Sequence, residues 1–129
     1  MGKFDLSRPT DAELAILRVL WRRGESTVRQ VFEALSEERE IGYTTVLKLM
    51  QIMTEKGLVE RDESERTHVY QASLTQEQTQ RQLVSDLLDK AFGGSASQLV
   101  LQALAAKPAS ADELARIRQL LDELEGGGK

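Results

Sequence analysis

The sequence predicts a mainly α-helical protein in which three short helices and a two-stranded hairpin are followed by three more helices. Three observations lead to this fold class. Apolar residues recur at intervals of three and four along six segments, as they do on one face of an amphipathic helix. Four segments open with the Ser/Thr-x-x-Glu/Gln pattern of a helix capping box. One stretch near the middle instead alternates apolar and polar residues, which predicts strands.

Capping residues mark the first two helices. Thr10 and Glu13 form a capping box, in which each side chain satisfies a backbone amide of the first turn, and Gly24 supplies a stop. Thr27 and Gln30 repeat the pattern after a short extended stretch at residues 25–26. The sequence therefore predicts one helix between Thr10 and Gly24 and a second that starts at Thr27.

A third helix and a hairpin complete the N-terminal half. Residues 44–56 form the helix, which follows a polar turn and ends at Gly57. Residues 58–61 and 67–72 come close to apolar–polar alternation, and the charged stretch 62–66 joins them. Three helices followed by a hairpin, the wing, is the order of a winged helix-turn-helix, which we assign to residues 1–74.

Residues 75–129 form three more predicted helices and a second domain. The first opens at the Thr75 capping box and ends at Gly93. The second is short and almost wholly apolar, begins at Ser97 and is terminated by Pro108, and the third begins at Ser110. An apolar helix of this kind needs a partner on most of its surface.

We expect this second domain to be a dimerisation domain. Domains shorter than about 70 residues rarely bury enough apolar surface alone, and a second copy about a two-fold axis is the simplest partner. The residues predicted to form the interface are Leu83, Leu87, Leu101, Leu104, Leu114, Ile117, Leu121 and Leu124. The alternative is a monomer in which the last apolar stripe packs on its own winged helix.

The third helix carries the predicted DNA contacts. On a helical wheel, Val46, Met50 and Met53 share the face that packs on the first two helices. The opposite face, here called the reading face, consists of Thr44, Leu47, Lys48 and Gln51. Hydroxyl, amide and ammonium groups meet base edges or phosphates, and an aliphatic group contacts a thymine methyl.

Four more residues are predicted to fix the protein on the DNA backbone. Tyr43 and Thr45 flank the start of the third helix, where hydroxyls and free amides hold phosphate. Arg61 and Arg66 lie in the wing, from which they reach the backbone or the adjacent minor groove. These contacts set register rather than sequence preference.

Composition excludes some functions and leaves one rival open. The chain has no cysteine and one histidine, His68, so we predict no catalytic site, no metal site and no cofactor. No apolar segment is long enough to be a signal or a membrane span, which predicts a cytoplasmic protein without direct membrane binding. The net charge of −4 favours the alternative of a winged-helix protein–protein interaction module without DNA contact.

The sequence also resembles a known family along nearly its whole length. The resemblance is carried by residues 6–7, 10–14, 19–21, 43–47, 55–59 and 99–101. Together these segments are similar to the penicillinase-repressor family of bacteria, often called BlaI/MecI/CopY. The resemblance implies a homodimeric winged-helix repressor that occupies a palindromic operator. It also implies a membrane sensor peptidase as antirepressor, which leads to cleavage of the repressor within its dimerisation region.

Three differences from the family limit which of its properties can be expected of this chain. Gln102 and Ala103 stand where members regulated by cleavage have an Asn-Phe bond, so proteolytic induction is left open. The absence of cysteine excludes the copper-responsive mode of some relatives. Ile52 replaces an arginine that many relatives carry late in the third helix, which removes one expected phosphate contact.

Overall fold

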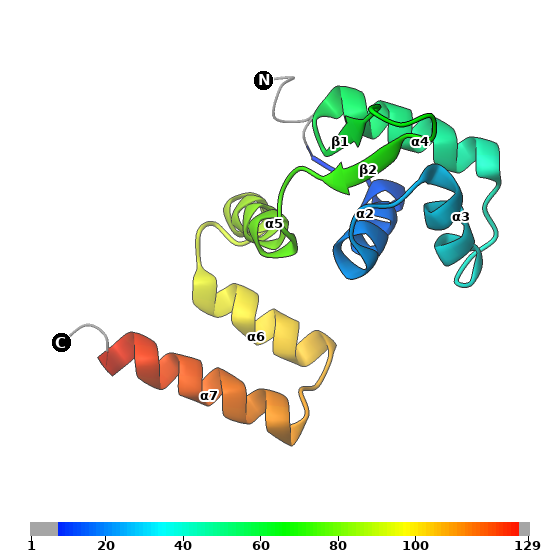
Figure 1. The fold of residues 1–129 in the computed structure, drawn as a ribbon. Coiled ribbons are helices and arrows are strands. Elements are labelled where there is room, and N and C mark those ends of the chain that lie inside the picture. Colours follow the sequence, from blue (N-terminus) through cyan, green and yellow to red (C-terminus); the bar gives the residue numbers. More distant parts are fainter. Residues whose placement is uncertain (1–7, 127–129) are drawn as a thin grey trace. The chain divides into compact units, whose positions relative to one another are not determined.

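The computed structural model describes residues 8–126, which form helices α2 to α7 and one two-stranded antiparallel sheet (Figure 1). Residues 6–7, which contribute to the family resemblance, lie outside that range. The chain divides into two compact units, Met1–Gln82 and Leu83–Lys129. The division lies inside α5 (Gln76–Ala91) rather than before it, and within the first turns of this helix Thr79 is buried.

Both predicted N-terminal capping boxes are confirmed. Helix α2 (Asp11–Arg23) begins at Thr10, whose hydroxyl accepts from the Glu13 amide at 3.2 Å while its own amide donates to Glu13 Oε1 at 2.9 Å. Helix α3 (Val28–Ser36) begins at Thr27, which exchanges the same pair of bonds with Gln30. The capping is local in sequence, and so is its prediction.

Helix α4 (Tyr43–Lys56) starts one residue earlier than predicted and ends at Gly57. Gly57 has a φ of +81°, a left-handed conformation that glycine adopts without a Cβ clash. Tyr43 is therefore the first residue of the helix rather than a residue flanking it. Gly42 precedes it as the N-cap and contributes no side-chain hydrogen bond.

The hairpin consists of β1 (Val59–Asp62) and β2 (Val69–Ala72), paired so that Arg61 lies opposite Tyr70. Strand β1 is displaced by one residue toward the C-terminus from the predicted 58–61, and β2 begins two residues later than predicted, so His68 precedes it instead of lying within it. Ser26 bridges β2 through two backbone bonds with Tyr70, at 2.8 and 3.0 Å. This bridge joins the wing to the segment between α2 and α3.

One hydrophobic core unites α2, α3, α4 and the wing in the N-terminal unit. Its fully buried side chains come from all three helices, and Val59 and Tyr70 extend it into the hairpin. The helix residues below 2% exposure are Ile16, Val19, Val31, Leu35, Val46, Met50 and Met53. The sheet is too small to be stable alone and depends on this packing.

A buried ion pair links the two ends of the same unit. Lys56 Nζ, in the last turn of α4, lies 2.7 Å from Glu13 Oε1 in the first turn of α2. The side chains are 13% and 3% exposed, and Lys56 also donates to the carbonyl of Arg8 at 3.2 Å. The Glu13 oxygen thus serves both the α2 cap and the ammonium group.

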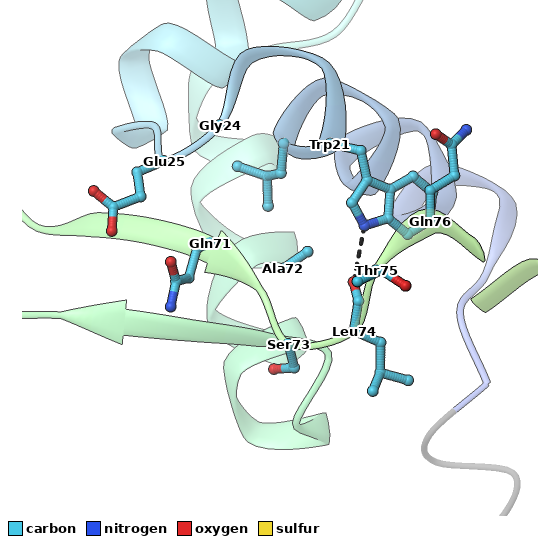
Figure 2. Close-up of a pocket in the computed structure, with 10 residues that line it drawn as sticks. Trp21, Gly24, Glu25, Gln71, Ala72, Ser73, Leu74, Thr75 and Gln76 are labelled. Carbon is cyan, nitrogen blue, oxygen red and sulfur yellow. Dashed lines mark hydrogen bonds between the residues drawn. The ribbon is translucent and has the colours of Figure 1, made fainter. Parts of the chain in front are cut away.

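Trp21 holds the segment that follows the wing. Its indole nitrogen donates to the carbonyl oxygen of Leu74 at 2.9 Å, and Figure 2 shows the ring pointing directly at this carbonyl. The two residues are 53 positions apart in the sequence. The bond fixes the chain where it leaves β2 and enters α5.

The C-terminal unit contains the end of α5 together with α6 (Ala96–Ala106) and α7 (Ala111–Gly126). Ser95, not Ser97, caps α6, and it accepts from the Gln98 amide. Ser110 and Glu113 form the predicted box at the start of α7. Although both helices are described over their full length, neither contains a buried residue.

Candidate nucleic-acid interface

Helix α4 has one buried face and one exposed face. Val46, Met50 and Met53 are completely buried, each with 0% exposure. Thr44, Lys48 and Gln51 are exposed, as the helical wheel predicts. Leu47 differs from the other three residues of the reading face, because it is half-buried and packs against the core.

The start of α4 combines hydroxyl groups with amides that have no side-chain cap. Tyr43 is 38% exposed, and Thr45, two residues further along the helix, is also exposed. Because Gly42 has no side chain, no hydroxyl or carboxylate of the N-cap accepts from the first-turn amides. No acidic residue occurs in this turn either. The positive end of the helix dipole is thus left available to an anion.

The Tyr43 side chain is fixed between two residues of α3. Its ring meets Phe32 edge-on, with centroids 5.7 Å apart and planes at 79°. The guanidinium carbon of Arg29 lies 5.2 Å from the centroid of the same ring. Edge-to-face aromatic pairs and guanidinium–ring stacks are both favourable geometries. Tyr43 therefore holds the start of α4 against α3.

A groove of about 590 Å³ opens between α3, the start of α4 and the wing. Tyr43, Leu47 and Arg66 all line it, so the structure brings three predicted contact residues together. Val28 and the buried Tyr70 contribute apolar surface, while His68, Arg29 and Glu33 add charged or titratable groups. The lining residues that complete the groove are Thr27, Gln30 and Thr67.

The two wing arginines differ in their partners. Arg61 Nε lies 2.6 Å from a carboxylate oxygen of Glu63, within the wing itself. A hydrogen bond with the Tyr70 hydroxyl, together with the charge of Glu63, raises the pKa of the Arg61 guanidinium. Arg66 is exposed at the groove. Since a paired arginine must give up its carboxylate to bind phosphate, Arg66 is the better placed of the two.

The wing turn also holds a carboxylate, that of Asp62, with a lowered pKa. The backbone amide of Ser64 donates to Asp62 Oδ1 at 2.9 Å, and this bond lowers the pKa of Asp62. Neither Asp62, at the end of β1, nor the next residue, Glu63, lines the groove.

Sequence reasoning did not single out Arg29. It lies in the first turn of α3, a turn with no acidic residue, where the helix dipole disfavours a cation. The Thr27 capping box marks the start of this helix, so the unfavourable position of Arg29 in its first turn could have been identified from the sequence. Only the structure brings the guanidinium onto Tyr43.

The N-terminal unit also has a hollow on the side of Trp21. This second hollow, of about 420 Å³, lies beside Trp21 and the residues after β2, drawn in Figure 2, with Glu25 as its single charged residue. Within residues 8–126, no three His, Asp or Glu side chains are grouped as metal ligands. No helix in that range has the length and apolar character to cross a bilayer.

The predicted dimerisation residues present apolar surface. Leu87, Leu101, Leu121 and Leu124 are between 50% and 66% exposed. Leu83, Leu104, Leu114 and Ile117 are half-buried. Within residues 83–126, three more large apolar side chains are also exposed, namely Val84, Val100 and Leu120.

The chain is similar in sequence to known bacterial regulators. The family model described as Penicillinase repressor matches residues 9–123. The Transcriptional regulator BlaI of Mycobacterium tuberculosis is 37% identical over 123 residues, covering 95% of this chain and 88% of the relative. The Penicillinase repressor of Bacillus licheniformis is 22% identical over 114 residues, covering 88% and 89% of the two chains.

A solved structure supports the fold of the N-terminal unit. The solution structure of the DNA-binding domain of the repressor BlaI aligns with a TM-score of 0.50 and 21% identity. It covers 55% of this chain and 87% of that domain. The winged helix-turn-helix and the family resemblance predicted from sequence are thus confirmed, and the chain belongs to the penicillinase repressor family, a family of transcriptional repressors and not of enzymes.

Proposed function

We propose that this protein is a transcriptional repressor that binds duplex DNA through α4, as a homodimer on a palindromic operator. The observation that carries the proposal is the division of α4 into a fully buried apolar face and an exposed face with Thr44, Lys48 and Gln51. A helix fixed by its apolar side and open on its polar side suits the major groove. Repressor function supports a cytoplasmic location, where the chromosomal DNA lies.

Because the chain is acidic overall, DNA binding must depend on where its cationic side chains lie. With a net charge of −4, bulk attraction to DNA is absent, and contacts must come from a few cations on one surface. Arg29, Arg66 and Lys48 belong to the groove or the exposed face of α4. The acidic wing residues Asp62 and Glu63 are outside the groove lining.

Replacing Lys48 by alanine should weaken DNA binding about tenfold without a change in melting temperature. The side chain is exposed, so its loss removes a charge-assisted contact to DNA but no core packing. Gel shift with a duplex from the chain's own promoter region, over a series of salt concentrations, measures the effect. Lys90→Ala makes the same charge change on a different helix, α5, and should bind as the unaltered protein does. If the unaltered protein shifts no upstream fragment at low salt, the repressor proposal fails.

The exposed leucines of α5, α6 and α7 support the homodimer. Several large apolar side chains exposed on neighbouring helices mark an interaction site, and a symmetric partner supplies the same residues in return. Two recognition helices about 34 Å apart, or a multiple of that spacing, then meet two half-sites of a palindrome. Dimerisation and operator affinity should therefore be linked.

Replacing Leu121 by glutamate should convert the dimer into a monomer. The change places a charge into both halves of a symmetric interface, which raises the dissociation constant at least about 100-fold. Light scattering of the unaltered protein should give twice the chain mass of 14.4 kDa. Gln119→Glu, an exposed position on the same helix, is the matched control and should stay dimeric. A dimeric Leu121→Glu variant would place the interface elsewhere.

Family membership also supports a membrane sensor peptidase as the antirepressor of this protein. Gln102 and Ala103 are exposed but lie within helix α6, and a protease needs an extended backbone. Cleavage at this bond therefore requires local unfolding of α6. Co-expression with a peptidase encoded beside the gene, followed by mass spectrometry of the repressor, tests whether the chain is cut.

A further inference from the structure

We propose that Arg29 and Tyr43 together form a binding site, here called the phosphate seat, for one phosphate of the DNA backbone. In this proposal the phosphodiester strand lies along the groove between α3, α4 and the wing. This inference rests on the proposed DNA-binding function and adds a contact from α3, made by Arg29. Its ligand is the sugar–phosphate backbone and not a base.

The Arg29 side chain is held ready for an anion. Its guanidinium carbon lies over the Tyr43 ring, 5.2 Å from the ring centroid, and Tyr43 is itself held edge-on by Phe32. A stacked guanidinium keeps its N–H groups in its own plane, pointing outward, where they match the oxygens of a phosphate. The stack also reduces the side-chain entropy lost on binding.

Among residues 8–126, Arg29 has no salt-bridge partner to displace. The ion pairs there include those of Arg22, Lys56, Arg61 and Arg81 but none of Arg29, whose side chain is exposed. It also occupies the first turn of α3, where the helix dipole opposes a cation. A bound phosphate compensates both the free charge and the unfavourable position.

The groove continues from Arg29 to the wing. Arg66 lines the same groove, together with Thr27 and Thr67, whose hydroxyl groups also bind phosphate oxygens. Among the lining residues, Glu33 is the single carboxylate. Two guanidinium groups against one carboxylate give the groove a net positive charge, which suits a polyanion.

Arg29→Ala in the full-length protein tests the proposal. Its affinity should fall about tenfold, and equally for a duplex from the chain's own promoter region and for an unrelated duplex of the same length. The slope of log affinity against log salt, which is negative, should become shallower by about 1, because one fewer phosphate is neutralised. Arg29→Lys should restore the slope but only part of the affinity, since lysine lacks the planar stack. Glu33→Gln should bind both duplexes more tightly.

The Tyr43→Leu variant separates the positioning role of Tyr43 from the contact that Arg29 makes with the phosphate. It should weaken binding to both duplexes while leaving the salt slope unchanged, because Arg29 keeps its charge but loses its stacking partner. Thermal melting of every variant checks that the fold is kept. Arg18→Ala, an exposed arginine of α2 outside the groove, is the matched control and should equal the unaltered protein.

The outcomes distinguish this inference from the proposed function. If the unaltered protein binds neither duplex at low salt, the DNA-binding proposal itself fails. If it binds, and Arg29→Ala matches Arg18→Ala in affinity and slope, the phosphate seat is wrong while the repressor proposal stands. A loss confined to the promoter duplex with an unchanged slope would likewise overturn the phosphate role, since it would indicate a base contact.

Discussion

Replacing Met50 by aspartate is expected to unfold the N-terminal unit at room temperature. Met50 is completely buried at the centre of the core. The change removes about 1.5–3 kcal/mol of apolar burial and places a carboxylate where it has no partner, which costs several kcal/mol more. Their sum approaches the whole stability of a small domain, about 5–15 kcal/mol.

The environment of Trp21 reports the result, since it is the only tryptophan and packs against this core. The near-ultraviolet circular dichroism and the fluorescence of Trp21 should lose their native signal in Met50→Asp. Gln51→Asp makes a similar charge change one residue later, on the exposed face. It should stay folded within about 0.5 kcal/mol and lose DNA binding. Equal unfolding of both variants would show that the two faces of α4 are wrongly assigned.

Replacing Glu13 by alanine should lower the stability of the same unit by about 3 kcal/mol, because Lys56 is left almost buried without its counter-ion. The Thr10 amide also loses the acceptor that completes the α2 capping box. For a unit of this size such a loss lowers the melting temperature by about 15 °C. Thermal denaturation followed by circular dichroism measures it.

The exposed pair of Arg22 and Glu38 is the matched control. These side chains lie 4.0 Å apart and are 57% and 56% exposed, so Glu38→Ala should cost less than about 1 kcal/mol. The double variant Glu13→Leu, Lys56→Met should be more stable than either single charge removal, since it leaves no buried ion. If Glu13→Ala and Glu38→Ala lowered the free energy of unfolding equally, the buried Glu13–Lys56 pair would contribute no more to stability than the exposed pair does.

Helix α4 shows how far periodicity predicts a candidate site. The spacing of Val46, Met50 and Met53 identified the core face, and all three are fully buried. The same wheel placed Leu47 on the opposite face, but it is half-buried beside the core and lines the groove. A wheel describes one isolated helix and contains no information about the neighbours that cover its sides.

The strand ends and the start of α6 differ from prediction for a similar reason. Alternation extended the second strand back to residue 67, yet His68 has no strand partner because pairing ends at the Asp62 to Val69 register. Ser97 and Ser95 are both acceptable N-caps by residue type, and Ser95 has the extended backbone and the bond to Gln98. Local propensity left these ends ambiguous, and backbone pairing resolved them.

The sequence by itself determined the helices, their capping boxes, the polarity of α4 and the family. These features depend on residues three or four positions apart, so short-range chemistry is enough to predict them. Only the tertiary structure decided which distant residues meet. Lys56 reaches Glu13 across 43 positions, and Arg29 meets Tyr43 because α3 packs against α4. Such contacts follow from the angle and register of packed elements, which no local pattern encodes.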